Sequence, residues 1–186
     1  MPLHYALTDG LVAIVAILCG LALARAKHSA AALGIGLFGL AGLIGTVRIT
    51  TGLIEPLAML HKGTSQLGGV AGLVLLLSGT LRARGFSHGF GLSLAMAVLA
   101  VMFTVIAPFG GMILFVIMLV IGLGLSVSAR HYLGAAGYLL MLLNIALVRQ
   151  SSYFGKDLSW HIYHLCVAAW LFCAAQSVLR QRQANR

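Results

Sequence analysis

Seven apolar runs follow one another along this chain, and the short segments between them carry almost all of its charge. Only 8% of the 186 residues are charged and 61% are hydrophobic, whereas about a quarter of the residues of a soluble domain are charged. Such a chain cannot cover a water-facing surface, so it belongs in a membrane. Because a span needs about 20 residues, we predict seven transmembrane helices, at residues 10–26, 30–50, 62–82, 88–107, 110–129, 132–149 and 158–180.

The predicted architecture is a single all-α transmembrane domain covering residues 1–186. The fourth and fifth runs are separated only by residues 107–111, Ala-Pro-Phe-Gly-Gly, a composition typical of a tight turn. If Pro108 instead kinks one continuous helix, six spans remain. Residues 51–61 form the longest connection, and their apolar character around Glu55 and Pro56 predicts a short interfacial or re-entrant segment.

Lysine and arginine are distributed unequally over the two sides of the predicted bundle. One side carries Arg25, Lys27, Arg82, Arg84, Arg130, Arg180, Arg182 and Arg186, and the other carries Arg48, Lys62, Arg149 and Lys156. Cytoplasmic loops collect these residues, so we expect the N-terminus outside and the C-terminus in the cytoplasm, in the inner (plasma) membrane of a bacterial cell. The net charge of +9 reflects this loop bias, and no basic run is long enough to indicate nucleic-acid binding.

The strongest functional signal lies at the start of the last apolar run. Asp157, His161 and His164 stand at i, i+4 and i+7, so a helix places them in one stripe. The chain has only two other acids, Asp9 and Glu55, and both fall on the same predicted outer side. Ionisable groups are costly inside a bilayer, so this cluster is a functional-site candidate.

Zinc is one ligand that such a cluster predicts. His161 and His164 can present two nitrogens to one metal ion, and His61 is the best third ligand because it lies on the same side. Asp157 or Asp9 would take a proton from the metal-bound water. The chain would then be a zinc-dependent hydrolase of an amide or ester in a lipid or amphiphile that enters from the bilayer.

Other interpretations of the same residues remain open. Asp157 can be an ordinary first-turn acid in a helix whose Trp160 and His161 belong to an interfacial aromatic belt. Haem b can be held between His61 and either histidine of the last run. A quinone pocket in which histidine and aspartate handle protons is a further hypothesis. The last two would make the chain an electron-transfer or non-catalytic subunit with protein partners in a membrane complex.

These residues and this topology resemble the CREST superfamily, which contains the alkaline ceramidases, the progestin/adiponectin-type receptors and the haemolysin III-like bacterial proteins. The resemblance implies a seven-helix bundle that holds zinc through His61, His161 and His164, with Asp157 or Asp9 near the bound water, and lipid-amide hydrolysis as in the ceramidases. The spacing differs, because the family's last pair is H-x-x-x-H and here it is His161-Ile162-Tyr163-His164.

Overall fold

The computed structural model describes residues 2–148 and 154–184, and the described residues are almost entirely helical, with no strand among them. The elements are α1 (Tyr5–Arg25), α2 (Ser29–Thr50), α3 (Ala58–Ala83), α4 (Phe90–Ile106), α5 (Pro108–Ser128), α6 (Tyr132–Leu143), η1 (Asn144–Val148) and α7 (Gly155–Ala184). The π-helix η1 continues α6 directly. Each predicted apolar run therefore corresponds to one helical segment.

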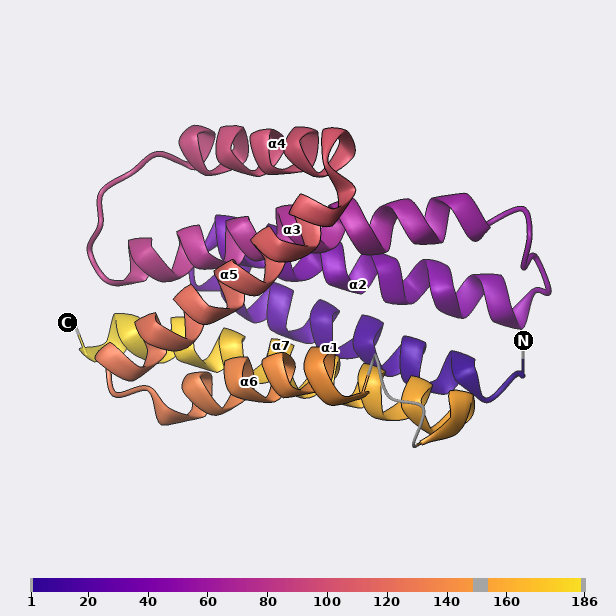
Figure 1. The fold of residues 1–186 in the computed structure, drawn as a ribbon. Helices are drawn as coiled ribbons and strands as arrows, with labels where there is room; N and C mark the ends of the chain where they lie inside the picture. Colours follow the sequence, from indigo (N-terminus) through magenta and orange to yellow (C-terminus); the bar gives the residue numbers. More distant parts are fainter. Residues whose placement is uncertain (1, 149–153, 185–186) are drawn as a thin grey trace.

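Five helices, α1, α2, α3, α5 and α7, are long and apolar enough to cross a membrane. Two shorter apolar segments, Phe90–Ile106 and Tyr132–Val148, complete the bundle. Successive helices run in opposite directions, so that the N- and C-termini lie at opposite ends (Figure 1). We call these the N-terminal end and the C-terminal end of the bundle.

Glycines bring α1, α2 and α3 into close contact. A Cβ at Gly72 would lie 2.7 Å from the carbonyl oxygen of Gly34, and a Cβ at Gly39 would lie 2.7 Å from the Cβ of Ala16. Small residues permit such approach in lipid, where burial of apolar area does not drive helix association. The glycine-rich second run is thus explained by packing.

The break between α4 and α5 falls at Ala107, and the chain reverses direction there (Figure 1). Pro108 is the first residue of α5, where its missing N–H costs nothing. Residues 51–57 form turns, and α3 begins directly after them at Ala58. Arg48 holds this connection, because its Nε donates to the carbonyl oxygen of Ile54 at 2.6 Å.

The apolar core takes buried side chains from α1, α2, α3, α5, α6 and α7, and from α4 at Ala100. Trp170, at 0% exposure, is its largest fully buried side chain, and Phe38 meets it edge-to-face with ring centroids 5.0 Å apart. Asn144, at the start of η1, donates from Nδ2 to the carbonyl oxygen of Tyr163 at 3.1 Å. This hydrogen bond joins the π-helix to α7 beside the candidate site.

Candidate functional site

The stripe predicted on the last helix faces α1, where each of its members meets a different partner. Asp157 accepts a hydrogen bond from the hydroxyl of Tyr5. The Nδ1 of His161 lies 3.2 Å from Oγ1 of Thr8. The third member, His164, meets Asp9. The stripe therefore forms as predicted, but its three side chains do not converge on one point.

The contact between His164 and Asp9 is the most buried polar pair of the site. The Nε2 of His164 lies 2.9 Å from Oδ1 of Asp9, whose side chain is 1% exposed. The other ring nitrogen, Nδ1, lies 2.8 Å from the carbonyl oxygen of Trp160. A carbonyl oxygen only accepts, so Nδ1 carries a proton.

The 2.9 Å contact brings the two groups close enough to share one proton if the ring turns slightly to complete a hydrogen bond. With Nδ1 protonated, a hydrogen bond between Nε2 of His164 and Oδ1 of Asp9 needs one more proton. That proton sits either on the imidazole, beside an ionised carboxylate, or on the carboxyl group, beside a neutral imidazole. In both forms the pair carries no net charge, which suits a site with little contact with water.

His61 approaches the same carboxyl group from α3. The space between them is left by Gly45, where a Cβ would lie 3.0 Å from Cγ of Asp9 and 3.0 Å from Nε2 of His61. Neither Oδ1 nor Oδ2 of Asp9 has a hydrogen-bond donor of good geometry among the described residues, so the 2.9 Å approach of His164 is an ion-pair contact. His164 and His61 therefore both approach the buried carboxyl group of Asp9, His164 at Oδ1 and His61 across the space left by Gly45.

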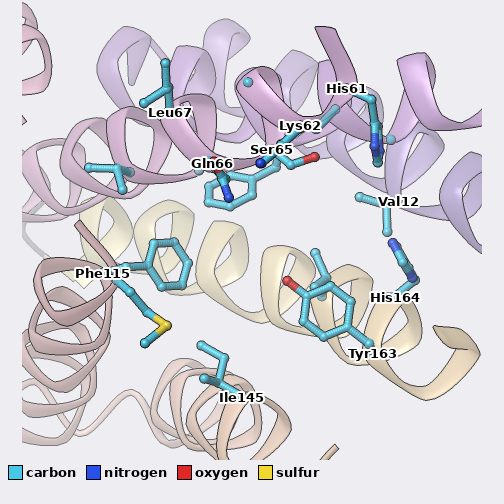
Figure 2. Close-up of a pocket in the computed structure, with 18 of the residues that line it drawn as sticks. Val12, His61, Lys62, Ser65, Gln66, Leu67, Phe115, Ile145, Tyr163 and His164 are labelled. Carbon is cyan, nitrogen blue, oxygen red and sulfur yellow. The ribbon is translucent and has the colours of Figure 1, made fainter. Parts of the chain in front are cut away.

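A cavity of about 1120 Å³ opens beside these three residues. Its polar lining comes from the starts of α1, α3 and α7 and includes Asp9, His61, Lys62, Ser159 and His164. Figure 2 shows the rings of His61 and His164 pointing toward one another at one side, with Phe115 away from them.

The rest of the lining is largely apolar. It includes Phe38, Val70, Phe115, Met141 and Val167. The volume exceeds the range of about 300–1,000 Å³ typical of small-molecule sites. The cavity can hold a molecule with a polar head and an apolar body.

The remaining predicted site residues lie elsewhere. Neither Asp157 nor His161 belongs to the cavity lining found among the described residues. Glu55 is exposed in the connection before α3. His4 is exposed and packs against the rings of Tyr5 and His161. Arg48 donates from Nε to the carbonyl oxygen of Ile54.

Comparison with known proteins gives no relative whose site could be compared with this one. No family model, curated protein or solved structure matches the chain. Its function must therefore be argued from the site itself.

The donors present do not fit the predicted zinc site. Within residues 2–148 and 154–184, no three His, Cys, Asp or Glu side chains are placed to hold one metal ion. Both ring nitrogens of His164 are engaged, by Trp160 and Asp9, and His161 faces Thr8. We therefore derive no reaction step through a metal.

The sequence indicates Asp9 only as a secondary acid and Gly45 only as one of a series of glycines attributed to helix packing. The available signal is an acid directly before the first predicted run at residue 10, on the same predicted side as His164 and His61. Gly45 belongs to the series of glycines in the second run, and nothing in the sequence distinguishes it from the glycines that pack against other helices.

Proposed function

We propose that this chain binds an amphiphilic molecule of the bilayer in its central cavity and exchanges a proton with the head group of that molecule. The observation that carries the proposal is the position of the Asp9–His164 pair at the polar side of a large and otherwise apolar cavity. The apolar lining would hold the body of the ligand, and Asp9, His61 and His164 would meet its head.

The proton held between Asp9 and His164 supplies the chemistry. A ligand oxygen close to Asp9 and His164 would compete for a proton shared between them, and the imidazole would keep its orientation through the Trp160 carbonyl. General acid–base groups work in this way when they lie within hydrogen-bond reach of the reacting atom. The head group is therefore one that can gain or lose a proton at oxygen.

Two ligand classes fit this description. A lipid amide or ester is the substrate of the hydrolase predicted from the sequence, and the resemblance to the CREST superfamily stays a prediction of that kind. A quinone is the second candidate, favoured because Asp9 and His164 lie beside an apolar space lined by Phe38 and Phe115. Haem b is less favoured, because neither ring nitrogen of His164 is free to ligate iron.

We place the site near the outer side of a bacterial plasma membrane, with seven spans and the C-terminus in the cytoplasm. The support is the bias of Lys and Arg toward the C-terminal end. Arg149 and Arg186, which entered that count, lie outside the described residues, as does the side chain of Arg182. A reporter fused to each terminus would test the orientation.

The binding proposal is tested by identifying what the purified protein retains. Organic extraction and mass spectrometry of the detergent-purified chain should yield one amphiphile in a ratio near one per chain. Val167→Trp, which fills the apolar part of the cavity, should reduce that ratio several-fold. Leu165→Trp is the matched control, because Leu165 is 47% exposed on the same helix. Equal retention by both variants would reject the proposal.

Metal analysis and absorbance spectra of the same preparation separate the ligand classes. About one zinc per chain would support the hypothesis of a metal-dependent hydrolase. A Soret band would support the hypothesis of a haem-binding subunit. An extracted quinone would select the second candidate.

A further inference from the structure

The charged residues of this chain are segregated along the bundle. All three acids, Asp9, Glu55 and Asp157, belong to segments at the N-terminal end. The C-terminal end, where α3, α5 and α7 finish and α6 begins (Figure 1), carries Arg84 and Arg130 among other cations. None of the three acidic side chains lies at this end to neutralise these cations.

A small pocket of about 160 Å³ lies among these cations, between the α5–α6 connection and the last turns of α7. Arg130, His131 and Arg180 line it, together with the first turn of α6 and Ser177. Its volume corresponds to roughly five water molecules at about 30 Å³ each. A tetrahedral oxyanion fits such a space.

The first turn of α6 directs backbone donors toward this pocket. His131 precedes the helix and its side chain makes no capping hydrogen bond. The N–H groups of Tyr132, Leu133 and Gly134 therefore have no partner within the helix. An uncapped helix N-terminus carries partial positive charge and binds anions.

Ser177 provides a second and independent donor. Its side chain is only 3% exposed, and Oγ has no hydrogen-bond partner among the described residues. It would lie 2.7 Å from a Cβ at Gly134, so the hydroxyl stands directly against the first turn of α6. A buried hydroxyl without a partner is costly, and an oxyanion in the pocket would accept from it.

Arg84 adds charge next to the pocket. Its Nη1 donates to Oγ of Ser128 at 3.2 Å, while Nε and Nη2 are buried without a partner among the described residues. Burial lowers the pKa of His131, and the nearby guanidinium groups of Arg84 and Arg180 lower it further. The residues around the pocket thus experience an excess of positive charge.

We propose that this pocket is a binding site for a phosphate group, held by Arg130, Arg180, the Ser177 hydroxyl and the N-terminus of α6. The phosphate belongs either to the head group of an acidic phospholipid at this face of the membrane or to a free phosphate ion. This site is separate from the central cavity and does not depend on the function proposed there.

The backbone offers a clean variant for testing this site. Arg130 has a φ of 57°, in the left-handed region that favours glycine. Arg130→Gly therefore removes the charge and also removes the backbone strain of a positive φ at a residue with a side chain. Lys27, with a φ of 63° in the α1–α2 connection at the same end, gives the matched control Lys27→Gly. Arg180→Gln serves as a second variant if Arg130→Gly does not fold.

The experiment measures the binding of two probes to the full chain. Inorganic phosphate is titrated against the detergent-purified protein, and native mass spectrometry counts phosphatidylglycerol retained from nanodiscs, with phosphatidylcholine nanodiscs as reference. We expect wild type and Lys27→Gly to bind alike. Arg130→Gly should bind at least about tenfold more weakly, as expected for loss of a charge-assisted contact. Ser177→Ala should weaken binding by a smaller factor.

The outcomes assign the source of the phosphate or remove the site. Retention of phosphatidylglycerol without binding of free phosphate identifies a lipid head group, and binding of free phosphate without lipid selectivity identifies a soluble anion. Absence of both in the wild type overturns the proposal. Equal losses in Arg130→Gly and Lys27→Gly also overturn it, because they would indicate only a general effect of net charge.

Discussion

The Nε2 of His164 on α7 lies 2.9 Å from Oδ1 of Asp9 on α1, while Nδ1 of the same ring lies 2.8 Å from the Trp160 carbonyl oxygen. Each ring nitrogen therefore faces its own acceptor, and a second proton on the imidazole would make the contact with Asp9 an ion pair. This contact links the last helix to the first and sets the chemistry available to the cavity.

We predict that Asp9→Asn and Asp9→Ala differ sharply. An asparagine amide can donate to Nε2 of His164. The free energy of unfolding of the asparagine variant should therefore lie within about 1 kcal/mol of the wild-type value. Asp9→Ala leaves that nitrogen without a partner and should cost about 1–3 kcal/mol, which is several degrees in Tm for a chain of this size. Thermal unfolding in detergent measures both. Equal destabilisation would show that the carboxylate charge, and not the hydrogen bond, holds the contact.

A second prediction concerns Gly45. Gly45→Ala places a methyl group against Asp9 and His61, so the head-group side of the cavity must rearrange, and retention of the co-purified amphiphile should fall. Gly36→Ala is the control on the same helix, because a Cβ there meets nothing within 4 Å. Mass spectrometry of extracts from both variants compares them. Unchanged retention by Gly45→Ala would mean that the ligand does not reach Asp9.

A third prediction separates Asp157 from the proton chemistry. Tyr5→Phe removes the hydroxyl that donates to Asp157 and should lower the Tm slightly, because a hydrogen bond to an exposed carboxylate contributes little to stability. Ligand retention should persist, since Asp157 is exposed and does not line the cavity. Asp157→Asn should likewise retain the ligand. If Asp157→Asn lost the ligand while its stability stayed unchanged, Asp157 would have to be counted among the ligand-binding residues.

The helix bounds were predictable because each depends on local information. An apolar run, the charged or glycine-rich segments beside it and a proline such as Pro108 determine where a helix begins and ends, and the predicted fifth span at 110–129 became Pro108–Ser128. Partners across helices depend instead on how each helix is rotated about its axis. Nothing in the sequence around Asp9 indicates that it meets His164 while Asp157 meets Tyr5.

The lowered pKa of His131 should appear in the pH dependence of stability. Its pKa in the folded chain lies below the ordinary value of 6.5, mainly through burial and then through Arg84 and Arg180. Below about pH 6.5 the unfolded chain then binds more protons than the folded chain at this residue, so stability is lost as the pH falls. Tm measured from pH 8 to pH 5 should decline less steeply in His131→Gln. An identical decline in both proteins would contradict this assignment.

The backbone contact at Gly72 gives a fifth prediction. Gly72→Ala brings a Cβ to 2.7 Å from the Gly34 carbonyl oxygen, and backbone cannot yield as a side chain can. We expect a loss of about 1–3 kcal/mol from overpacking, measured by thermal unfolding. Gly36→Ala should be neutral or slightly stabilising, because alanine favours helix. Stability of Gly72→Ala equal to that of Gly36→Ala would mean that α2 and α3 are not in backbone contact.

The same glycines determine which helices of the molecule can move relative to one another. Helices that touch through their backbones, as α2 and α3 do at Gly34 and Gly72, have no side-chain layer to deform, so they must move as one rigid body. In α4 only small residues, Ser93, Ala97, Ala100 and Thr104, are buried, and this helix packs mainly on α3 and α5. Any motion that admits a bulky ligand is therefore expected in α4 and the start of α5, whereas Asp9 on α1 stays with the rigid helices.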